Sequence, residues 1–271
     1  MWRNYTNPKK ECALHLYVME IIMSMKDIQL IHGDCLVEMK NIPDGSIDMI
    51  LCDLPYGTTA CKWDTIIPFE PLWKEYKRMI KHNGAIVLFG TQPFTSKLIA
   101  SNMEMWKYDW IWEKPQGVNF AQCNHMPMSV YETISVFGNF GLSKNAKIQP
   151  CYYPQGLVEL NKPKKAKTYS EHRPTSNNKD HVQVYGNYPR QIIKFGAARG
   201  LHPTQKPVDL LEYLIKTYTK DGETVLDNCM GSGSTGVACL RTKRKFIGIE
   251  LNDTYFDVAK KRIEEELLKS L

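Results

Sequence analysis

Short aliphatic runs that alternate with helical patterns are the feature that most restricts the fold of this chain. Runs of β-branched and aliphatic residues predict seven strands, at 28–31, Ile47–Cys52, 85–89, 108–112, 133–137, Thr224–Asp227 and 245–249. Helical periodicity predicts helices between them, at 69–81, Val208–Tyr218, 236–241 and 254–269. Strands that alternate with helices favour an α/β fold with a mostly parallel sheet covered on both faces. Ligands of such sheets bind beyond the carboxyl ends of the strands, so residues that follow a strand are the first candidates for a site.

The composition excludes several classes of protein. Of the 271 residues, 43% are hydrophobic and 24% are charged, which is too apolar for a disordered chain. No uncharged run reaches the roughly 18 residues that span a bilayer. The eight cysteines are irregularly spaced without a C-x-x-C pair, which argues against a zinc ribbon and a disulfide framework. We therefore expect a soluble cytoplasmic protein with no metal site and no membrane contact.

Residues 1–25 do not continue the pattern of strands and helices. Their apolar stretch is interrupted by His15 and Glu20 and lacks a small-residue cleavage site, which disfavours a signal peptide. Two alternatives remain for this N-terminal extension. It is either an added helix or an upstream extension of the reading frame, with Met23 or Met25 as the natural start.

Positive charge is concentrated between residues 139 and 200. This segment has eleven lysines and arginines against three acids, a charge of +8, so the rest of the chain carries −2 of the net +6. It is also interleaved with aromatic residues, rich in Asn, Pro and Ser, and without a long apolar period, so we expect mostly loops. Such a segment is typical of a surface that contacts phosphates and bases. The alternative is a solvated loop that serves solubility.

A carboxylate, a proline and an aromatic ring directly follow the predicted strand Ile47–Cys52. The sequence there is Asp53-Leu54-Pro55-Tyr56. The carboxylate and the Pro55 carbonyl can both accept hydrogen bonds from an amine, and the tyrosine ring offers a flat face for stacking. Because Asp and Pro are also turn residues, the alternative is a simple strand-terminating turn.

A glycine-rich stretch separates the predicted strand Thr224–Asp227 from the next helix. It runs from Asp227 to Gly236 and matches neither a nucleoside-triphosphate P-loop nor a clean G-x-G-x-x-G pattern. Glycines at such a turn let the backbone approach a ligand, and the helix N-terminus favours an anion. The following strand ends in Glu250, an acid placed to bind ribose hydroxyls. The two features predict an adenosine-type cofactor, and a purely structural origin is the alternative.

Taken together, these residues resemble the β-class amino-methyltransferases of DNA, the N6-adenine and N4-cytosine enzymes. From about Lys26 on, the family's motifs follow one another in order: a G-D-C element at 31–35, the [DNS]-P-P-[YF] tetrapeptide at 53–56, a W-x-K strand at 110–115, an H-P-x-x-K-P signature at 202–207 and a D-P-F-x-G-S-G-T-T loop at 227–235. A tetrapeptide that precedes the cofactor loop, with a basic insert between them, is the permuted β order. The chain departs from the family pattern at Leu54, which replaces a proline, and at Asn228-Cys229, which replaces Pro-Phe. Neither change removes a charged or donor group that the chemistry requires.

The resemblance implies a Rossmann-like, S-adenosylmethionine-dependent methyltransferase fold with a seven-stranded sheet. It implies a catalytic domain formed by residues 26–138 and 201–271, and a target-recognition insert at 139–200. The implied cofactor is S-adenosyl-L-methionine, and the implied partner is double-stranded DNA. A homodimer and a cognate restriction endonuclease are further partners that the resemblance leaves open.

The resemblance also implies roles for individual residues. The catalytic residues are those of the tetrapeptide, Asp53, Leu54, Pro55 and Tyr56. The cofactor-binding residues are Asp34, Cys35, Asp53, His202, Thr204, Lys206, Pro207, Asp227, Gly231, Ser232, Gly233, Ser234, Thr235, Glu250, Leu251 and Asn252. Lys206, Ser234 and Thr235 are the ones expected to meet the methionine carboxylate. The DNA-binding residues are Lys162, Lys164, Lys165, Lys167, Arg173, Arg190 and Arg199.

In the family that this chain resembles, enzymes whose tetrapeptide begins with Asp or Asn mostly methylate adenine N6, and those that begin with Ser mostly methylate cytosine N4, so Asp53 favours adenine N6 as the acceptor. A carboxylate accepts a hydrogen bond from an amine more strongly than the serine hydroxyl found in many N4-cytosine enzymes. Three alternatives stay open: an N4-cytosine DNA methyltransferase, a methyltransferase of RNA or protein amides, and a catalytically silent nucleic-acid-binding module.

Overall fold

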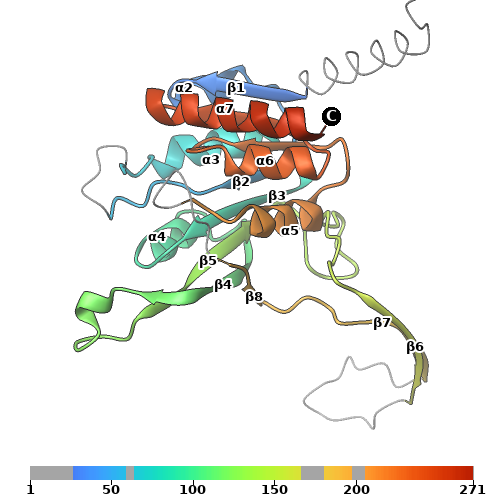
Figure 1. Ribbon diagram of the computed structural model, residues 1–271. Coiled ribbons are helices and arrows are strands. Elements are labelled where there is room, and N and C mark those ends of the chain that lie inside the picture. The colour runs from blue at the N-terminus through green and yellow to red at the C-terminus, as the bar shows by residue number, and fades with distance from the viewer. Residues whose placement is uncertain (1–26, 59–63, 166–179, 197–204, 271) are drawn as a thin grey trace, which may run out of the picture.

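The computed structural model describes residues 27–58, 64–165, 180–196 and 205–270, so the N-terminal extension lies outside it. Over these ranges the chain forms an eight-stranded sheet and a separate two-stranded hairpin (Figure 1). The strands of the large sheet, in spatial order, are β1 (Ile28–His32), β10 (Lys245–Glu250), β9 (Thr224–Asp227), β2 (Ile47–Cys52), β3 (Ile80–Gly90), β5 (Ser129–Phe137), β4 (Trp106–Val118) and β8 (Ile192–Lys194).

Most neighbouring strands in this sheet are parallel. β1, β10, β9, β2 and β3 all run in one direction, β5 is antiparallel to both β3 and β4, and β8 is parallel to β4. The predicted α/β fold with a mostly parallel sheet is therefore confirmed, and each of the seven predicted strands is present. The sequence does not predict β8, which adds an eighth strand beside β4.

Helices cover both faces of the sheet. One face carries α5 (Val208–Tyr218), α6 (Ser234–Arg241) and α7 (Asp253–Ser270), and the other carries α2 (Cys35–Glu38), α3 (Phe69–Met79) and α4 (Phe94–Ser101). All six residues of β2 are buried: Met49 and Leu51 belong to the core beneath α5–α7, and Ile50 and Cys52 to the core beneath α2–α4. A strand that is apolar on both sides is stable only between two such layers.

The spacing of buried residues predicts the helix α3, and strand pairing sets its C-terminal end. Its buried residues Leu72, Trp73, Tyr76 and Met79 recur at helical spacing. The prediction of a helix at 69–81 is two residues too long, because Ile80 already pairs with β2 as the first residue of β3. The eight residues of α4 are too short a window for a helical period, so the sequence does not predict this helix.

Two hairpins project from the body of the molecule. The β4–β5 arm, residues 114–131, continues β4 and β5 beyond the core and carries a short 3₁₀ turn, η2 (Phe120–Gln122), at its tip. The β6–β7 arm is formed by β6 (Val158–Lys164) and β7 (His181–Gly186). Figure 1 shows the two arms leaving the lower part of the molecule on opposite sides.

The segment 139–200 is less loop-rich than its sequence predicts, because it contains β6, β7 and β8. Its ends are anchored in the body: Phe140 is buried in the core, and β8 pairs with β4. Periodicity misses β6 and β7 because nearly all of their residues are exposed, so no buried face produces an alternation. The limits of a target-recognition insert at 139 and 200 stay a prediction. None of the helices in the described ranges is long and apolar enough to cross a membrane.

Candidate active site

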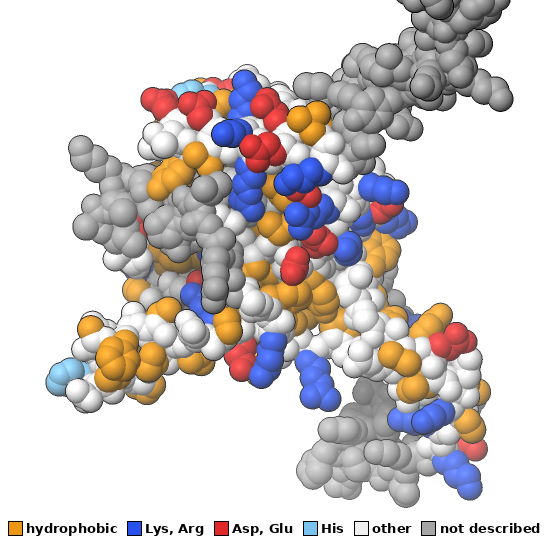
Figure 2. All heavy atoms as spheres, viewed as in Figure 1, with side chains coloured by type: hydrophobic (Ala, Val, Ile, Leu, Met, Phe, Trp, Pro, Cys, Tyr) orange, Lys and Arg blue, Asp and Glu red, His pale blue; other side chains and the backbone are white. Residues whose placement is uncertain are grey.

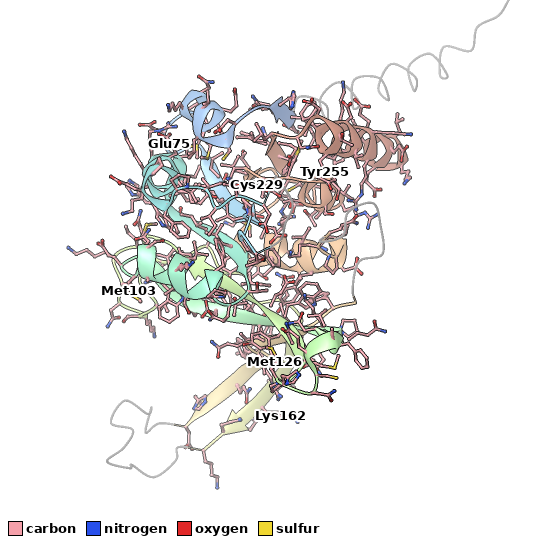
Figure 3. All side chains as sticks on the ribbon, turned by 90° about the vertical axis from the view of Figure 1, so that its left-hand side faces the viewer. Glu75, Met103, Met126, Lys162, Cys229 and Tyr255 are labelled. Atoms are coloured by element: carbon pink, nitrogen blue, oxygen red, sulfur yellow. The ribbon has the colours of Figure 1, made fainter. Side chains whose placement is uncertain are left out.

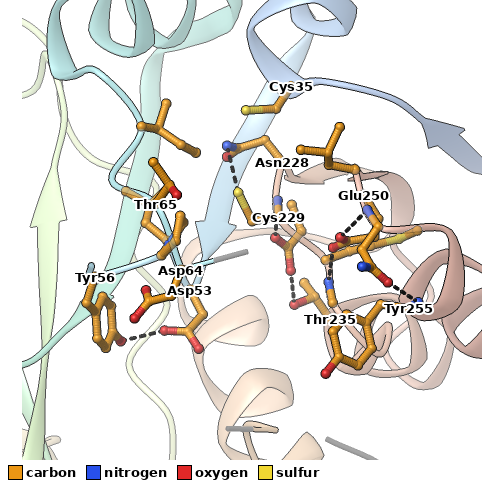
Figure 4. A pocket seen from close by; sticks show the side chains of 18 of the residues that line it. Cys35, Asp53, Tyr56, Asp64, Thr65, Asn228, Cys229, Thr235, Glu250 and Tyr255 are labelled. Carbon is orange, nitrogen blue, oxygen red and sulfur yellow. Dashed lines mark hydrogen bonds between the residues drawn. The ribbon is translucent and has the colours of Figure 1, made fainter. Parts of the chain in front are cut away.

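A cavity of about 590 Å³ lies at the carboxyl ends of the central strands (Figure 4). The order of the strands reverses between the neighbours β9 and β2, since the chain continues from them to opposite sides of the sheet, to β10 and to β3. Open α/β sheets bind ligands at such a reversal point. The cavity is lined by residues that follow β1, β2, β9 and β10 and by residues that precede α5.

One side of the cavity, which we call the carboxylate wall, carries Asp34, Asp227 and Glu250. Glu250 accepts two hydrogen bonds from backbone N–H groups, from Gly231 at Oε2 and from Asn252 at Oε1, each at 2.9 Å. Asp34 caps α2 by accepting a hydrogen bond from a backbone N–H of that helix at 2.7 Å. Backbone groups of the adjoining loops therefore fix the positions of these carboxylates.

The two glycines of the loop after β9 serve different purposes. Gly231 has φ +51°, and a Cβ placed there would meet no atom within 4 Å, so the backbone of this loop borders open space in the cavity. Gly233 has φ +76°, and a Cβ there would lie 3.0 Å from the Cβ of Ala259 in α7. Gly233 therefore allows α7 to pack closely, and it does not line the cavity.

Asp227 is the most buried carboxylate of this wall. Its Oδ2 accepts a hydrogen bond from the Thr235 hydroxyl at 2.6 Å, and its Oδ1 accepts one from the Cys229 N–H at 3.1 Å. Burial raises the pKa of Asp227 to about 6, although both hydrogen bonds oppose this shift. Asp227 therefore changes its charge near pH 6.

The other side of the cavity, which we call the ion-pair wall, carries Asp53, Pro55, Tyr56 and Lys206. The Tyr56 hydroxyl donates a hydrogen bond to Asp53 Oδ1 at 2.5 Å, and the Lys206 ammonium donates one to Oδ2 (Figure 4 shows the first). Burial and the neighbouring Asp53 carboxylate raise the pKa of Tyr56 well above its usual range, so its hydroxyl stays protonated. The Asp53 carboxylate is thus held at both oxygens.

Lys206 connects this wall to the root of the β4–β5 arm. Its ammonium lies 3.4 Å from Glu132 Oε2, and Glu132 Oε1 lies 2.5 Å from Lys114 Nζ. Burial lowers the pKa of Lys206, but the carboxylates of Asp53 and Glu132 outweigh burial and raise it. Burial raises the pKa of Glu132, but the two lysines outweigh burial and lower it. Lys206 and Glu132 therefore both carry their charges at neutral pH, inside the protein.

A family of DNA methylases matches residues 47–261, a range that includes Asp53, Lys206, Asp227 and Glu250. The chain belongs to the DNA methylase family. A Streptococcus pneumoniae protein named Type II methyltransferase M2.DpnII is 30% identical to this DNA methylase over 263 residues, which cover 88% of this chain and 90% of the relative. An Escherichia coli protein named DNA adenine methyltransferase YhdJ is 32% identical over 261 residues, which cover 87% and 82%.

Solved structures agree with this assignment. The M1.HpyAVI–SAM complex is 26% identical, with a TM-score of 0.57, covering 87% of this DNA methylase and 99% of that chain. PvuII DNA methyltransferase, described as cytosine-N4-specific, is 13% identical with a TM-score of 0.61, covering 90% and 92%, and shows the fold alone. Together with the family match, they confirm the DNA methyltransferase fold and family that the ordered motifs indicate.

Most of the predicted cofactor residues come together in this DNA methylase. Those that line the cavity are Asp34, Cys35, Asp53, Lys206, Asp227, Gly231, Ser232, Ser234, Thr235, Glu250, Leu251 and Asn252, together with Leu54, Pro55 and Tyr56 of the tetrapeptide. Pro207 and Gly233 do not line it: Pro207 directly precedes the first residue of α5, and Gly233 packs against α7. His202 and Thr204 lie outside the described residues.

The three residues that are expected to meet the methionine carboxylate have protein partners that the sequence does not predict. Lys206 pairs with Asp53 and Glu132, Thr235 donates its hydroxyl to Asp227, and Ser234 accepts a hydrogen bond from Arg262 at 2.9 Å. Their contact with a methionine carboxylate stays a prediction.

The predicted DNA-binding residues that the structure describes do not line the cavity. Lys162 and Lys164 are exposed on the β6–β7 arm, Lys165 directly follows β6, and Arg190 is exposed between β7 and β8 (Lys162 is labelled in Figure 3). Lys167, Arg173 and Arg199 lie outside the described residues. Their contact with DNA stays a prediction.

The sequence analysis misses the buried charges behind the ion-pair wall and the carboxylate that holds the adjoining loop. Lys114 stands within the W-x-K strand and Glu132 directly precedes a predicted strand, but only the hairpin brings them together. Asp64 accepts hydrogen bonds from the backbone N–H groups of Gly57 at 2.8 Å and Thr58 at 2.9 Å. Asp64 therefore fixes the start of the loop that follows the tetrapeptide. No local sequence pattern predicts this role of Asp64.

Proposed function

We propose that this DNA methylase transfers the methyl group of S-adenosylmethionine to the exocyclic N6 amine of adenine in double-stranded DNA. The observation that carries the proposal is the Asp53 carboxylate at the end of β2, held by Tyr56 and Lys206 in the same cavity as Glu250 and the glycine-rich loop. One cavity thus joins groups suited to an amine with groups suited to an adenosine cofactor.

The carboxylate wall fits S-adenosylmethionine. A volume of about 590 Å³ is in the usual range of cofactor sites. Glu250 and Asp34 offer acceptors for hydroxyl and amine donors, the Gly231 backbone borders open space, and Asp227 offers negative charge to a cationic group. Bound there, the cofactor would supply an electrophilic methyl group on a positively charged sulfur.

The ion-pair wall is suited to position the acceptor amine. The lone pair of an exocyclic amine is delocalised into the base, which makes the amine a weak nucleophile. Hydrogen bonds from the amine to Asp53 and to the Pro55 carbonyl favour a more tetrahedral nitrogen with an available lone pair. Each carboxylate oxygen can accept more than one hydrogen bond, so Asp53 can hold the amine while Tyr56 and Lys206 remain bound. Positioning and fixed charges then supply most of the catalysis.

A target base inside a duplex cannot reach this cavity unless it leaves the base stack. Enzymes that modify bases rotate the nucleotide out of the helix and hold it by stacking and hydrogen bonds. The half-buried ring of Tyr56, whose centroid is 4.9 Å from that of Phe94, is the stacking face next to Asp53. We propose that the target base packs on this ring.

Two observations favour adenine as the target. The tetrapeptide begins with a carboxylate, which is a stronger acceptor for an amine than a hydroxyl. One relative that is 32% identical over most of the chain is named a DNA adenine methyltransferase.

The proposal is tested by incubating the purified protein with unmethylated plasmid DNA and isotope-labelled S-adenosylmethionine. Digestion to nucleosides and mass spectrometry should find labelled N6-methyladenine, and Asp53→Ala should yield none. N4-methylcytosine in its place would contradict the choice of base. Label in RNA or protein but not in DNA would contradict the substrate, and DNA binding without transfer would indicate a silent binding module.

Further partners are proposed beyond DNA. Relatives from several bacteria are named type II methyltransferases, which supports a cognate restriction endonuclease as the partner of this chain in a cytoplasmic modification system. Protection of plasmid DNA methylated by this protein against an endonuclease encoded beside it tests this pairing. Sedimentation of the purified protein tests the homodimer, and fractionation of expressing cells tests the location.

A further inference from the structure

The tip of the β4–β5 arm has an unusual composition for an exposed surface. Residues 115–131 contain no Lys, Arg, Asp or Glu, although charged residues make up 24% of the chain. Several large apolar side chains are exposed there, among them Phe120 at 76% and Met126 at 46%. In Figure 2 the tip, at the lower left, shows hydrophobic and histidine side chains without charged ones. Exposed apolar groups gathered on a projecting element indicate a contact with a partner.

Four polar side chains of this arm are free to bind a partner. Gln116, Asn119, Gln122 and His125 make no side-chain hydrogen bond to any residue that the structure describes. Amide side chains can donate and accept at the same time, which suits them to the edges of bases.

The backbone at the tip of the arm forms a hydrogen-bonded turn. Backbone hydrogen bonds link Gln122 to Asn119 at 2.9 Å, Cys123 to Phe120 at 3.1 Å and His125 to Gln122 at 2.8 Å. The Phe120 side chain is therefore presented on a folded turn.

The arm begins beside the active site. Its root residue Lys114 pairs with Glu132, which faces the Lys206 ammonium that binds Asp53. In Figure 1 the arm projects on the same side of the molecule as the loop that follows β2. A duplex whose target base reaches the Asp53 side of the cavity therefore comes within reach of this arm.

The β6–β7 arm differs in its chemistry. It carries Lys162 and Lys164, with Lys165 directly after it, and lies on the other side of the molecule. Lysines suit the phosphate backbone, whereas an uncharged surface of aromatic, thioether and amide groups suits bases that have been unstacked.

We infer that the β4–β5 arm contacts bases of the target DNA, with Phe120 inserting into the base stack disturbed by removal of the target base. This inference rests on the proposed function. The arm carries no carboxylate that would repel the duplex, and an inserted aromatic ring replaces part of the stacking that the extruded base loses. The exposed amide side chains of Gln116, Asn119 and Gln122 offer donors and acceptors to base edges.

The test uses a duplex containing the site identified by sequencing plasmid DNA that the wild-type protein has methylated. Methylation is compared on this duplex and on one with an abasic site opposite the target base, where no base pair has to be broken and no unpaired base is left for an inserted ring to support. Phe120→Ala should slow methylation of the paired duplex by about tenfold or more, and of the abasic duplex by less than about threefold. Phe120→Trp should restore most of the wild-type rate, because it restores an aromatic surface.

Three controls separate this role from others. Met103→Ala removes an apolar side chain that is 58% exposed on the body and should leave both rates unchanged. Phe120→Ala should leave the salt dependence of DNA binding unchanged, whereas replacing Lys162, Lys164 and Lys165 by Gln should reduce its slope by about one unit for each phosphate that these lysines bind in the wild type. Sedimentation should give the same oligomeric state for Phe120→Ala and wild type.

Equal losses on the two duplexes, or no loss on the paired one, would overturn the inference. A change of oligomeric state in Phe120→Ala would also overturn it and would make the arm a contact between copies of this chain. A wild-type protein that methylates no DNA would overturn the proposed function together with the inference, which distinguishes the two failures.

Discussion

The two walls of the cavity hold their charges by different means. In the carboxylate wall, Asp34 and Glu250 accept hydrogen bonds from backbone N–H groups that lie 2 to 19 residues away in the sequence. In the ion-pair wall, Asp53 is bound by Lys206, which is 153 residues away. The first wall is built mainly by turns and helix ends, and the second by the packing of distant segments. We therefore expect damage to the first wall to weaken cofactor binding, and damage to the second to reduce turnover and stability.

The largest effect is expected for Asp53→Ala. This change should abolish methyl transfer, because the acceptor amine loses its charged hydrogen-bond partner, while S-adenosylmethionine should bind almost as well as before. Turnover with labelled cofactor and calorimetric titration measure the two quantities. A variant that keeps more than about a tenth of wild-type turnover would remove the distinction between the walls.

Glu132→Gln should lower the free energy of unfolding by about 3 kcal/mol, because Lys114 loses its ion-pair partner and the buried Lys206 keeps Asp53 but loses the second carboxylate beside it. Urea denaturation measures this loss. The matched control is Glu113→Gln, which breaks a solvent-exposed pair with Lys194. It should cost less than about 1 kcal/mol. Equal losses in the two variants would show that the ion pairs of Glu132 contribute no more to the free energy of unfolding than an exposed pair does.

Glu250→Ala should weaken S-adenosylmethionine binding by about 1–3 kcal/mol, because the cofactor loses a charged acceptor and the loop loses two backbone hydrogen bonds. Turnover at saturating cofactor should change much less. Calorimetric titration and saturation kinetics separate the two effects. The matched control is Asp253→Ala, an exposed acid at the start of α7, which should bind the cofactor as wild type does. Unchanged affinity in Glu250→Ala would move the cofactor away from the carboxylate wall.

The smallest effect is a dependence of cofactor affinity on pH. Burial raises the pKa of Asp227 to about 6, so the carboxyl is neutral below that pH and negative above it. Affinity for the positively charged cofactor should rise severalfold between about pH 5 and 7 and then level off. The folding stability of the ligand-free protein depends on pH in the opposite direction. A raised carboxyl pKa in the folded state contributes stability at low pH, and this stability is lost as the pH rises toward 6. Calorimetry across this range should show the rise in wild type and a flatter profile in Asp227→Asn.

The same contrast explains which parts of the molecule can be predicted from sequence. The strands of the core are visible as runs of buried residues, and the groups of the carboxylate wall stand directly after them, so motif and position coincide. The ion pairs of Lys206 are not visible, because their partners come from β2 and β5 and meet only in the folded sheet. β8 is missed for a similar reason: its three residues become a strand only because the chain after β7 returns to lie beside β4. The sequence therefore predicts groups that stand next to a recognisable strand, and it does not predict contacts between distant segments.

The β6–β7 arm enters and leaves the body at a single place, because Val158 and Gly186 pair with each other at its base. A segment with joined ends can be replaced without changing the distance that the flanking chain must bridge. We therefore expect the β6–β7 arm to be replaceable as a unit. A hairpin of different length or charge, grafted between these two residues, should leave Phe140, β8 and the strands around the cavity in their register. Such a graft would change the charge that the β6–β7 arm presents to a partner while the groups of the cavity stay in place.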